Sequence, residues 1–184
     1  MIWIRFEAIS GSEAIVTTEE EARQSLQEGR EGSQGKEKLV SHDAESRIRS
    51  SFAKQGHMTA VGAIIGPISP GSVEIALRPS PSTSQQHGFV HGGIVSAIAD
   101  TAAGYAALSM MPPGTGVLTV EFKINFVAPA AGERIIARGR VVKPGRTLVL
   151  TQTDVFAETA GKEKLIAVLT GTMMVVQERE GISD

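Results

Sequence analysis

The chain has 184 residues, a formal net charge of −2 and an aromatic content of 4%. This length suits one domain with its own core and is short for two. The near-neutral charge and the scarcity of aromatic rings argue against a nucleic acid as the main partner. The chain contains no cysteine, which excludes a disulfide framework, a thiolate nucleophile and cysteine-ligated zinc and fits a cytoplasmic location.

The first 39 residues are predicted to form a poorly organised extension. Apolar and polar residues alternate over residues 2–8, which favours a short strand, and Thr18 with Glu21 forms a capping-box pattern before a polar helix to about Glu28. The opening residues lack the basic head and long apolar run of a signal peptide. We therefore predict an extension over 1–39, one domain over 40–177 and a tail over 178–184.

The start of the domain is predicted to be a surface helix followed by two strands. Ile48 and Phe52 lie four residues apart among charged residues, which indicates an amphipathic helix from Ser41 to Gln55. Strands are expected at 59–65 and 72–77, joined by a turn rich in glycine and proline. A loop over 79–84 then leads to the centre of the sequence.

The central segment is a helix predicted from Ile94 to Met111 and ended by two prolines. Its only ionisable side chains are Asp100 and Tyr105, and apolar residues fill every face. Such a helix is expected to be buried all round. Its polar residues argue against a membrane span, so no membrane partner is expected.

The remaining sequence is predicted to be strand after strand. Leu118, Val120, Phe122, Ile124 and Phe126 alternate with polar residues, so Thr119 is predicted to lie on the more polar face of this strand, opposite to Leu118. Strands at 133–142, 147–158 and 165–176 follow, the first two joined by a turn at 143–146 with Pro and Gly in type II positions. This order predicts an α+β fold in which a curved antiparallel sheet wraps around the long helix. Because one small sheet covers such a helix poorly, we expect a homodimer or a dimer of dimers, that is, a homotetramer.

Asp100 is the strongest candidate for a functional residue. A carboxylate in so apolar a helix is costly to bury without a partner, and no Lys or Arg lies within a turn or two of it. The alternative is a carboxylate that faces solvent or caps a loop. Gly92 and Gly93 lie where the helix begins, where a ligand can approach unpaired N–H groups. Gly92 and Asp100 are about 12 Å apart along the axis, so they would act on one carbonyl only from two copies of the helix.

The order of these residues resembles a known family. His91-Gly92-Gly93, then a helix with Asp100-Thr101-Ala102, then a strand from Leu118, resemble the hotdog-fold acyl-CoA thioesterases of the phenylacetic-acid-degradation type (PaaI-like). The likeness covers roughly residues 40–177. It implies a hotdog fold and hydrolysis of an aromatic or medium-chain acyl-CoA to free acid and CoA, without a cofactor.

The resemblance also implies roles for individual residues. Asp100 matches the catalytic carboxylate, and Gly92 matches the glycine whose N–H binds the thioester oxygen. His91 matches the motif histidine, Thr119 matches a Ser or Thr that helps to hold water, and Gln85 stands where many members carry Asn. The sequence leaves open whether Asp100 is nucleophile or general base, and whether His91 transfers a proton or positions the loop.

Substrate binding is predicted to involve the helix start and a basic cluster. Gly93 is expected to contact the substrate, while Arg138, Lys143 and Arg146 suit the phosphates of coenzyme A, although a solvated strand face explains the same charges. His87 and His91 have the spacing of zinc ligands, but Gly88 lies between them and the glutamate of the helical zinc motif is missing, so no metal is expected.

Two other functions remain open. A hotdog dehydratase would resemble this chain in fold, but the D-x-N-P-x-H run of that class is absent. A non-catalytic acyl-CoA sensor would bind the same ligand, and such sensors usually append a DNA-binding helix pair, whereas residues 1–56 contain no basic recognition helix.

Overall fold

The structure is a computed structural model that describes residues 44–177 and 181, which belong to one compact unit. The strand and helix predicted within the extension, and the tail apart from Gly181, lie outside the described residues. Residues 44–52 are helical. After them come α2 (Gly56–Ala60), β1 (Ala63–Ser69), β2 (Ser72–Leu77), the 3₁₀ turn η1 (Pro81–Thr83), α3 (Gly92–Leu108), β3 (Gly116–Phe126), β4 (Arg134–Lys143), β5 (Leu148–Thr159) and β6 (Lys162–Val176).

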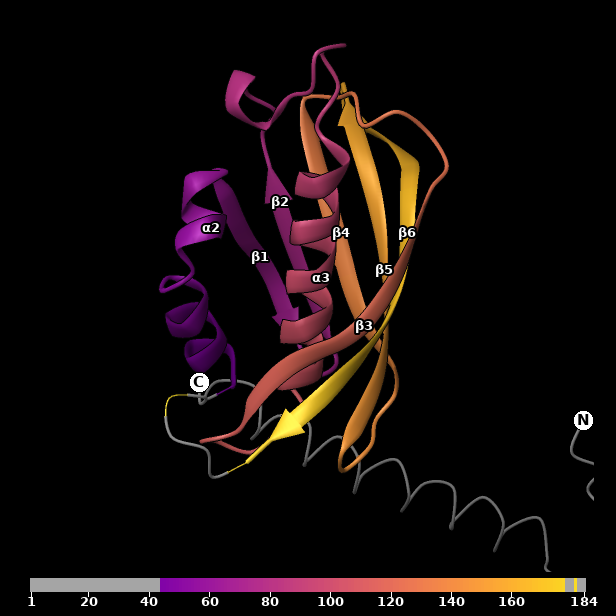
Figure 1. Ribbon diagram of the computed structural model, residues 1–184. Coiled ribbons are helices and arrows are strands. Elements are labelled where there is room, and N and C mark those ends of the chain that lie inside the picture. The colour runs from indigo at the N-terminus through magenta and orange to yellow at the C-terminus, as the bar shows by residue number, and fades with distance from the viewer. Residues whose placement is uncertain (1–43, 178–180, 182–184) are drawn as a thin grey trace, which may run out of the picture. The chain divides into compact units, whose positions relative to one another are not determined.

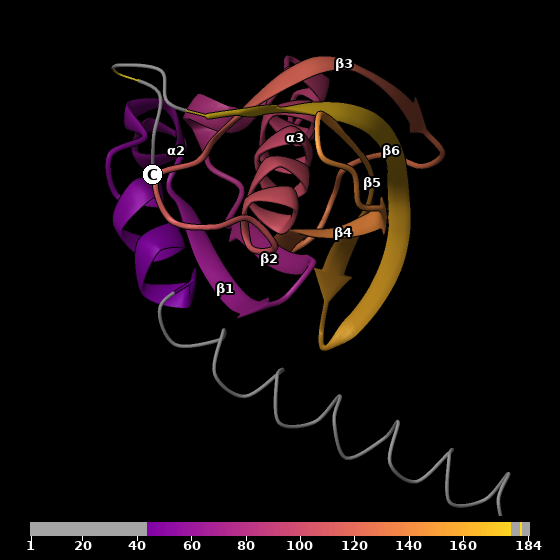
Figure 2. The same cartoon turned by 90° about the horizontal axis from the view of Figure 1, so that it is seen from below.

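The six strands form one antiparallel sheet in the order β1-β2-β4-β5-β6-β3. Figure 1 shows α3 lying along the concave face of this sheet, and Figure 2, seen from below, shows the sheet curving around the helix until β3 passes on its other side. The predicted α+β hotdog architecture is confirmed. No helix in the described part of the chain is long and apolar enough to cross a membrane.

The helix α3 packs closely on β4 and is hydrogen-bonded to β5. A Cβ atom on Gly139 of β4 would lie 2.4 Å from the backbone carbonyl of Ala102, so only glycine allows this approach. Beside it, the buried hydroxyl of Thr153 donates to the carbonyl oxygen of Ala99 at 3.0 Å. Ala99 and Ala102 are fully buried. The sheet therefore fixes both the height and the rotation of the helix turn that carries Asp100.

The amphipathic helix predicted upstream is confirmed over residues 44–52. Its apolar side faces the domain, with Ile48 fully buried and the ring of Phe52 tilted against Tyr105 of α3 at a centroid distance of 6.1 Å. This packing joins a segment at the start of the domain to the second half of the central helix.

The first strand was predicted too early. Thr59 and Ala60 belong to α2, and β1 begins at Ala63 after Gly62, whose φ of +69° suits glycine at the end of a helix. The strand then continues through Gly66 and Pro67, which were predicted to be turn. A register shift between Ile65 and Ile68 accommodates the proline, which has no N–H to pair.

The central helix, predicted from Ile94 to Met111, begins at Gly92 and ends at Leu108 in the structure. The hydroxyl of Ser109 donates to the carbonyl oxygen of Ala106 at 2.7 Å and accepts from the N–H of Gly71 at 2.7 Å, so the chain leaves the helix before the prolines. The helix is not buried all round within one chain. Its residues Ile94, Ala97, Asp100 and Thr101 are only half-buried, which leaves one stripe open.

The face assignment of β3 was wrong around Thr119. Thr119 pairs with the buried Met173, whereas Glu121 pairs with Thr172 on the outer face, and the register shifts between them. This bulge puts Thr119 on the face that looks at α3, together with Phe122 and Ile124. Leu118 pairs with Met174 and lies on the outer face instead.

The hairpins after β3 are confirmed, with one exception in turn type. The β5–β6 turn has Ala160 and Gly161 at φ of 50° and 73°. Gly145, predicted to occupy the left-handed position of a type II turn, does not have a positive φ. A glycine is required there because a Cβ would lie 2.1 Å from the carbonyl oxygen of Leu148.

Candidate active site

The site centres on Asp100, halfway along α3. Its Oδ1 accepts a hydrogen bond of 2.8 Å from the hydroxyl of Thr119 on β3. The resemblance implied that Thr119 helps to hold water, and it did not predict this direct bond to Asp100. Burial raises the pKa of the Asp100 carboxyl above its ordinary value, and the bond from Thr119 lowers that pKa in part. The structure therefore holds a partly desolvated carboxylate in a fixed orientation, which is what a base or nucleophile requires.

Asp100 opens onto a pocket with a cavity volume of about 440 Å³, within the range of small-molecule sites. The pocket runs beside α3 from Asp100 and Thr119 to Leu108 and Gly116. Its far wall comes from the upstream segment. The residues of that wall and of the adjoining helix turn are Ser51, Gln55, Gly104 and Tyr105. Among the described residues that line the pocket, Asp100 is the only acid, and none is basic.

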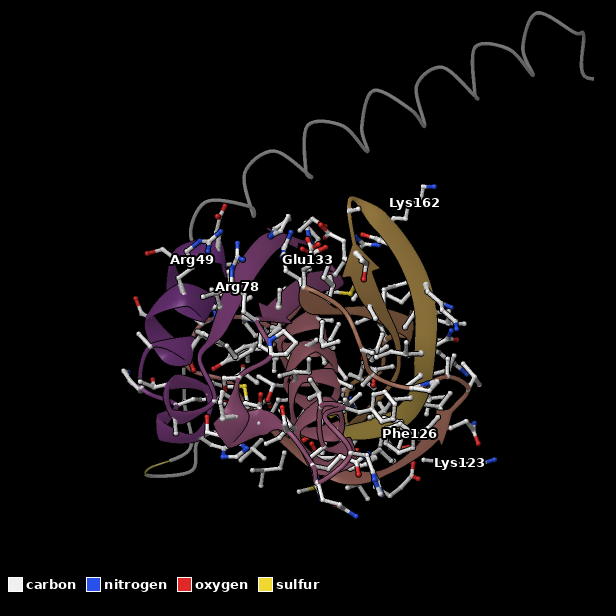
Figure 3. All side chains as sticks on the ribbon, turned by 90° about the horizontal axis from the view of Figure 1, so that it is seen from above. Arg49, Arg78, Lys123, Phe126, Glu133 and Lys162 are labelled. Atoms are coloured by element: carbon white, nitrogen blue, oxygen red, sulfur yellow. The ribbon has the colours of Figure 1, made fainter. Side chains whose placement is uncertain are left out.

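A second element of the site lies at the start of α3. His91 is the N-cap, and its Nδ1 accepts a hydrogen bond of 2.9 Å from the N–H of Gly93. Within the described residues the N–H of Gly92 has no recorded acceptor, so it is free for a ligand. The ring of Phe126, labelled in Figure 3, lies over Gly92, since a Cβ there would meet its Cζ at 3.3 Å.

The loop before α3 contains Gln85. Its N–H donates to the carbonyl oxygen of Phe89 at 2.8 Å and its own carbonyl accepts from Gly88 at 3.0 Å, so the backbone forms a closed turn. The N–H of His91 is anchored to Thr83 at 2.9 Å. Gln85 is therefore held near the start of α3, and its side chain is half-buried with no recorded hydrogen bond among the described residues.

One chain does not bring Gly92 and Asp100 together. They belong to one unbroken helix, in which eight residues separate them by about 12 Å along the axis. Gly92 lies near Phe126, at the end of β3, whereas Asp100 bonds to Thr119 near its beginning.

The basic residues predicted to bind phosphate lie apart from one another. Arg138 donates to Glu74 at 2.8 Å and to both carboxylate oxygens of Glu163 at 2.7 Å, and its guanidinium lies over the ring of Phe156 at 5.1 Å. These bonds raise the pKa of Arg138 further above its usual range and lower that of Glu163. Three of its five N–H donors bind these two carboxylates, which already balance its charge, so we do not carry Arg138 forward as a phosphate ligand.

Lys143 and Arg146 are exposed in and beside the β4–β5 connection. The register brings this connection to the same end of the sheet as the beginning of β3, since Leu148 and Gly116 both lie opposite the last residues of β6. Lys143 and Arg146 therefore stay predicted ligands of the coenzyme A phosphates. Among the described residues, no group of three or more His, Asp or Glu side chains is arranged to hold a metal ion.

Three pocket residues were not identified from the sequence. Nε2 of Gln55 donates to the hydroxyl of Tyr105 at 2.9 Å, and this hydroxyl donates to Oγ of Ser51 at 3.2 Å. Ser51 and Gln55 lie four residues apart, and in the helix predicted to Gln55 this spacing puts both on one side, whereas the observed helix ends at Phe52 and Gln55 follows it. That spacing was a usable signal, but nothing local linked it to Tyr105, about fifty residues away.

A sheet wrapped around a helix defines the hotdog class, and a half-buried carboxylate at a pocket and a free N–H at the helix start are groups that a hydrolase of this class can use. A family described as the thioesterase superfamily matches residues 87–164. Acyl-coenzyme A thioesterase 13 of Homo sapiens is 30% identical over 120 residues, covering 65% of this chain and 81% of that protein.

Solved structures agree in fold. A thioesterase family protein from Silicibacter pomeroyi shares 46% identity with a TM-score of 0.71, covering 73% of this chain and 98% of that one. The E. coli PaaI protein from the phenylacetic acid degradation operon, at 22% identity and a TM-score of 0.68, covers 78% of this chain and 98% of that one and shows the fold alone. The chain belongs to the thioesterase superfamily. It is a thioester hydrolase.

Proposed function

We propose that the chain is an acyl-CoA thioesterase in which Asp100 of one subunit and the Gly92 N–H of another act on the same thioester. The observation that supports this most directly is the hydrogen bond that orients the half-buried Asp100 carboxylate at the edge of a pocket. The acyl-coenzyme A named for the human relative supports coenzyme A as the leaving group.

The proposed reaction uses the two groups in sequence. Asp100 takes a proton from water while the oxygen of that water adds to the thioester carbon, or its carboxylate attacks the carbon directly. In both cases the carbonyl oxygen becomes negatively charged, and the free N–H of Gly92 stabilises it together with the positive end of the helix dipole. Collapse breaks the carbon–sulfur bond, and coenzyme A leaves as a thiolate. When water is the nucleophile, the thiolate takes up the proton that Asp100 removed from that water. After direct attack, water hydrolyses the anhydride to the free acid and the Asp100 carboxylate, and a proton released from this water goes to the thiolate.

The second subunit is supported by the exposure of β3. This strand is an edge of the sheet, spans Gly116–Phe126 and has Val120 and Phe126 exposed at 54% and 52%. A long apolar edge strand is a site for pairing with another chain. The open stripe of α3 that contains Asp100 is also only half-buried. Antiparallel pairing of two β3 strands about a two-fold axis would cover both surfaces and bring the partner's helix start toward Asp100.

The first experiment is thiol release from a panel of aromatic and medium-chain acyl-CoAs, followed with a thiol-reactive dye. The protein has no cysteine and gives no background. Asp100→Asn is expected to lose activity by about a thousandfold or more. Asp154→Asn, the same change at a half-buried carboxylate of β5, is the matched control and is expected to remain active. Tight binding of acyl-CoA with no turnover by the unmodified protein would favour a sensor instead.

The second experiment tests the role of Gly92. His91 has φ −61° and ψ 136°, which a following proline tolerates, and Gly92 is the first residue of the helix. Gly92→Pro therefore removes the N–H without breaking the helix, while Gly92→Ala keeps it and adds the same Cβ against Phe126. We expect the proline variant to be slower than the alanine variant by about a hundredfold.

Mixing two inactive variants tests whether the site is shared between subunits. A dimer of one Gly92→Pro chain and one Asp100→Asn chain would contain one doubly altered site and one intact site. Random exchange of subunits would then restore about a quarter of the unmodified activity. If both groups acted from the same chain, mixing would restore nothing.

A further inference from the structure

The far wall of the pocket carries a polar cluster that the proposed chemistry does not use. It consists of Ser51 and Gln55 from the upstream segment and Tyr105 from α3, joined by the two hydrogen bonds of 2.9 and 3.2 Å through the Tyr105 hydroxyl. The family match begins at residue 87, so Ser51 and Gln55 lie outside it. This cluster is separate in sequence from the residues that hold the thioester.

The cluster is held firmly. Tyr105 is 5% exposed and its ring packs against Phe52. Tyr105 is five residues beyond Asp100, about 7.5 Å further along the axis. Because Asp100, Gly104 and Leu108 repeat at four-residue intervals and all line the pocket, this side of α3 forms a continuous floor between the carboxylate and the cluster.

The cluster has unused hydrogen-bonding capacity. The Tyr105 hydroxyl accepts from Gln55 and donates to Ser51, so its proton is committed. Among the described residues no acceptor is recorded for the Ser51 hydroxyl and no donor for Oε1 of Gln55. One free donor and one free acceptor side by side match a ligand hydroxyl, which accepts and donates at once. A methyl group at the same place would leave both unpaired.

The charges of the pocket limit the ligand further. Within the described lining residues there is no basic side chain, and Asp100 is an acid. A substrate ending in a carboxylate would be repelled by Oε1 of Gln55 and by the negative charge of Asp100, and no cation would compensate this repulsion. A long hydrocarbon tail would reach the polar wall before it was fully accommodated.

Resting on the thioesterase activity proposed above, we infer that Gln55 and Ser51, held by Tyr105, select short acyl groups whose far end carries a neutral hydroxyl. They are specificity-determining residues of the same pocket. The hydroxyl binds between Ser51 and Gln55 while the thioester lies at Asp100.

The test compares two acyl-CoAs of equal length, ω-hydroxyhexanoyl-CoA and heptanoyl-CoA, which differ by a terminal hydroxyl in place of a methyl. We expect kcat/KM to favour the hydroxylated substrate by about tenfold or more. Gln55→Leu is expected to bring the ratio to about one or below. Tyr105→Phe keeps the ring against Phe52 and is expected to lower the ratio in the same direction. Gln152→Leu, the same change on the outer face of β5, is the matched control and is expected to keep the ratio.

The outcomes separate the two proposals. Turnover of both thioesters with no preference, or with a preference for heptanoyl-CoA, overturns the selectivity and leaves the thioesterase intact. Absence of turnover with any acyl-CoA overturns the thioesterase, and calorimetric binding of the same two thioesters then decides the selectivity from their ratio of Kd. A ratio that Gln55→Leu does not change overturns the role of the cluster.

Discussion

The hydroxyl of Thr119 donates to Oδ1 of Asp100 across 2.8 Å and so ties the edge strand β3 to the central helix. This contact depends on the bulge between Thr119 and Glu121, because without it the strand would turn the hydroxyl to the outer face. One irregularity in strand pairing thus decides whether the carboxylate has a partner.

The pH dependence of activity should report Asp100. Burial raises the pKa of this carboxyl from 3.8, so kcat/KM should rise with pH through an inflection above the ordinary aspartate value. The Thr119 bond lowers the pKa, so Thr119→Val should move the inflection to higher pH, while Thr119→Ser should restore it. A pH–rate profile of thiol release measures this. An inflection that is the same in all three proteins would contradict the assignment.

The contribution of Asp100 to folding stability should fall as pH rises, the opposite of its effect on activity. Since the folded-state pKa of Asp100 is raised above the unfolded value, the folded protein binds the proton more tightly. The group therefore favours folding below its unfolded pKa, and this contribution is lost as pH rises through the folded pKa. Asp100→Asn should thus gain stability over the unmodified protein at neutral pH, and the gain should shrink on acidification. Urea unfolding of both proteins along a pH series measures it, and a gain independent of pH would refute it.

The close approach of helix and sheet should be sensitive to a single methyl group. A Cβ at Gly139 would lie 2.4 Å from the backbone of Ala102, so Gly139→Ala should destabilise the fold by about 3 kcal/mol. Gly56→Ala is the control, because nothing lies within 4 Å of its added Cβ. Urea midpoints measure the difference, and equal midpoints would show that α3 can move away from β4 without cost.

The two roles considered for His91 can be distinguished by substitution. Its Nδ1 accepts from Gly93, so the neutral ring carries its proton on Nε2, which favours capping over proton abstraction. His91→Asn should keep the cap and most of the activity, whereas His91→Ala should cost about 1 kcal/mol of stability. Thiol release and thermal unfolding measure the pair. If both variants lost about a hundredfold in kcat with unchanged stability, His91 would be a proton-transfer residue.

The fold could be predicted because its signals are local. An apolar helix followed by strands of period two has few architectures open to it, and the observed sheet is the expected one. The error in the strand faces arose where the pairing with a neighbouring strand decides which way a side chain points. Thr119 was assigned to the wrong face because a bulge depends on the partner strand β6 and leaves no mark in the alternation of β3 itself.

The candidate site was predictable only in part. Asp100 was evident as a lone acid in an apolar helix, and the resemblance picked out Thr119, which the structure brings into a hydrogen bond with Asp100. That Thr119 helps to hold water stays a prediction. Arg138 was expected to bind phosphate because its carboxylate partners could not be identified from the sequence. Glu74 and Glu163 are 64 and 25 residues away from it in the chain. The contacts of Tyr105 with Ser51 and Gln55 were missed for the same reason, since they span about fifty residues.

The helix of residues 44–52 was described above as a packing element, held by Ile48 and Phe52. Its position also means that bond cleavage and recognition of the acyl group would depend on two different segments of the sequence. The residues that would break the bond come from α3 and β3, while two of the three that would recognise the far end of the acyl group come from a segment that precedes the sheet. Exchange of that segment could therefore retune which thioesters are accepted and leave the bond-breaking groups in place.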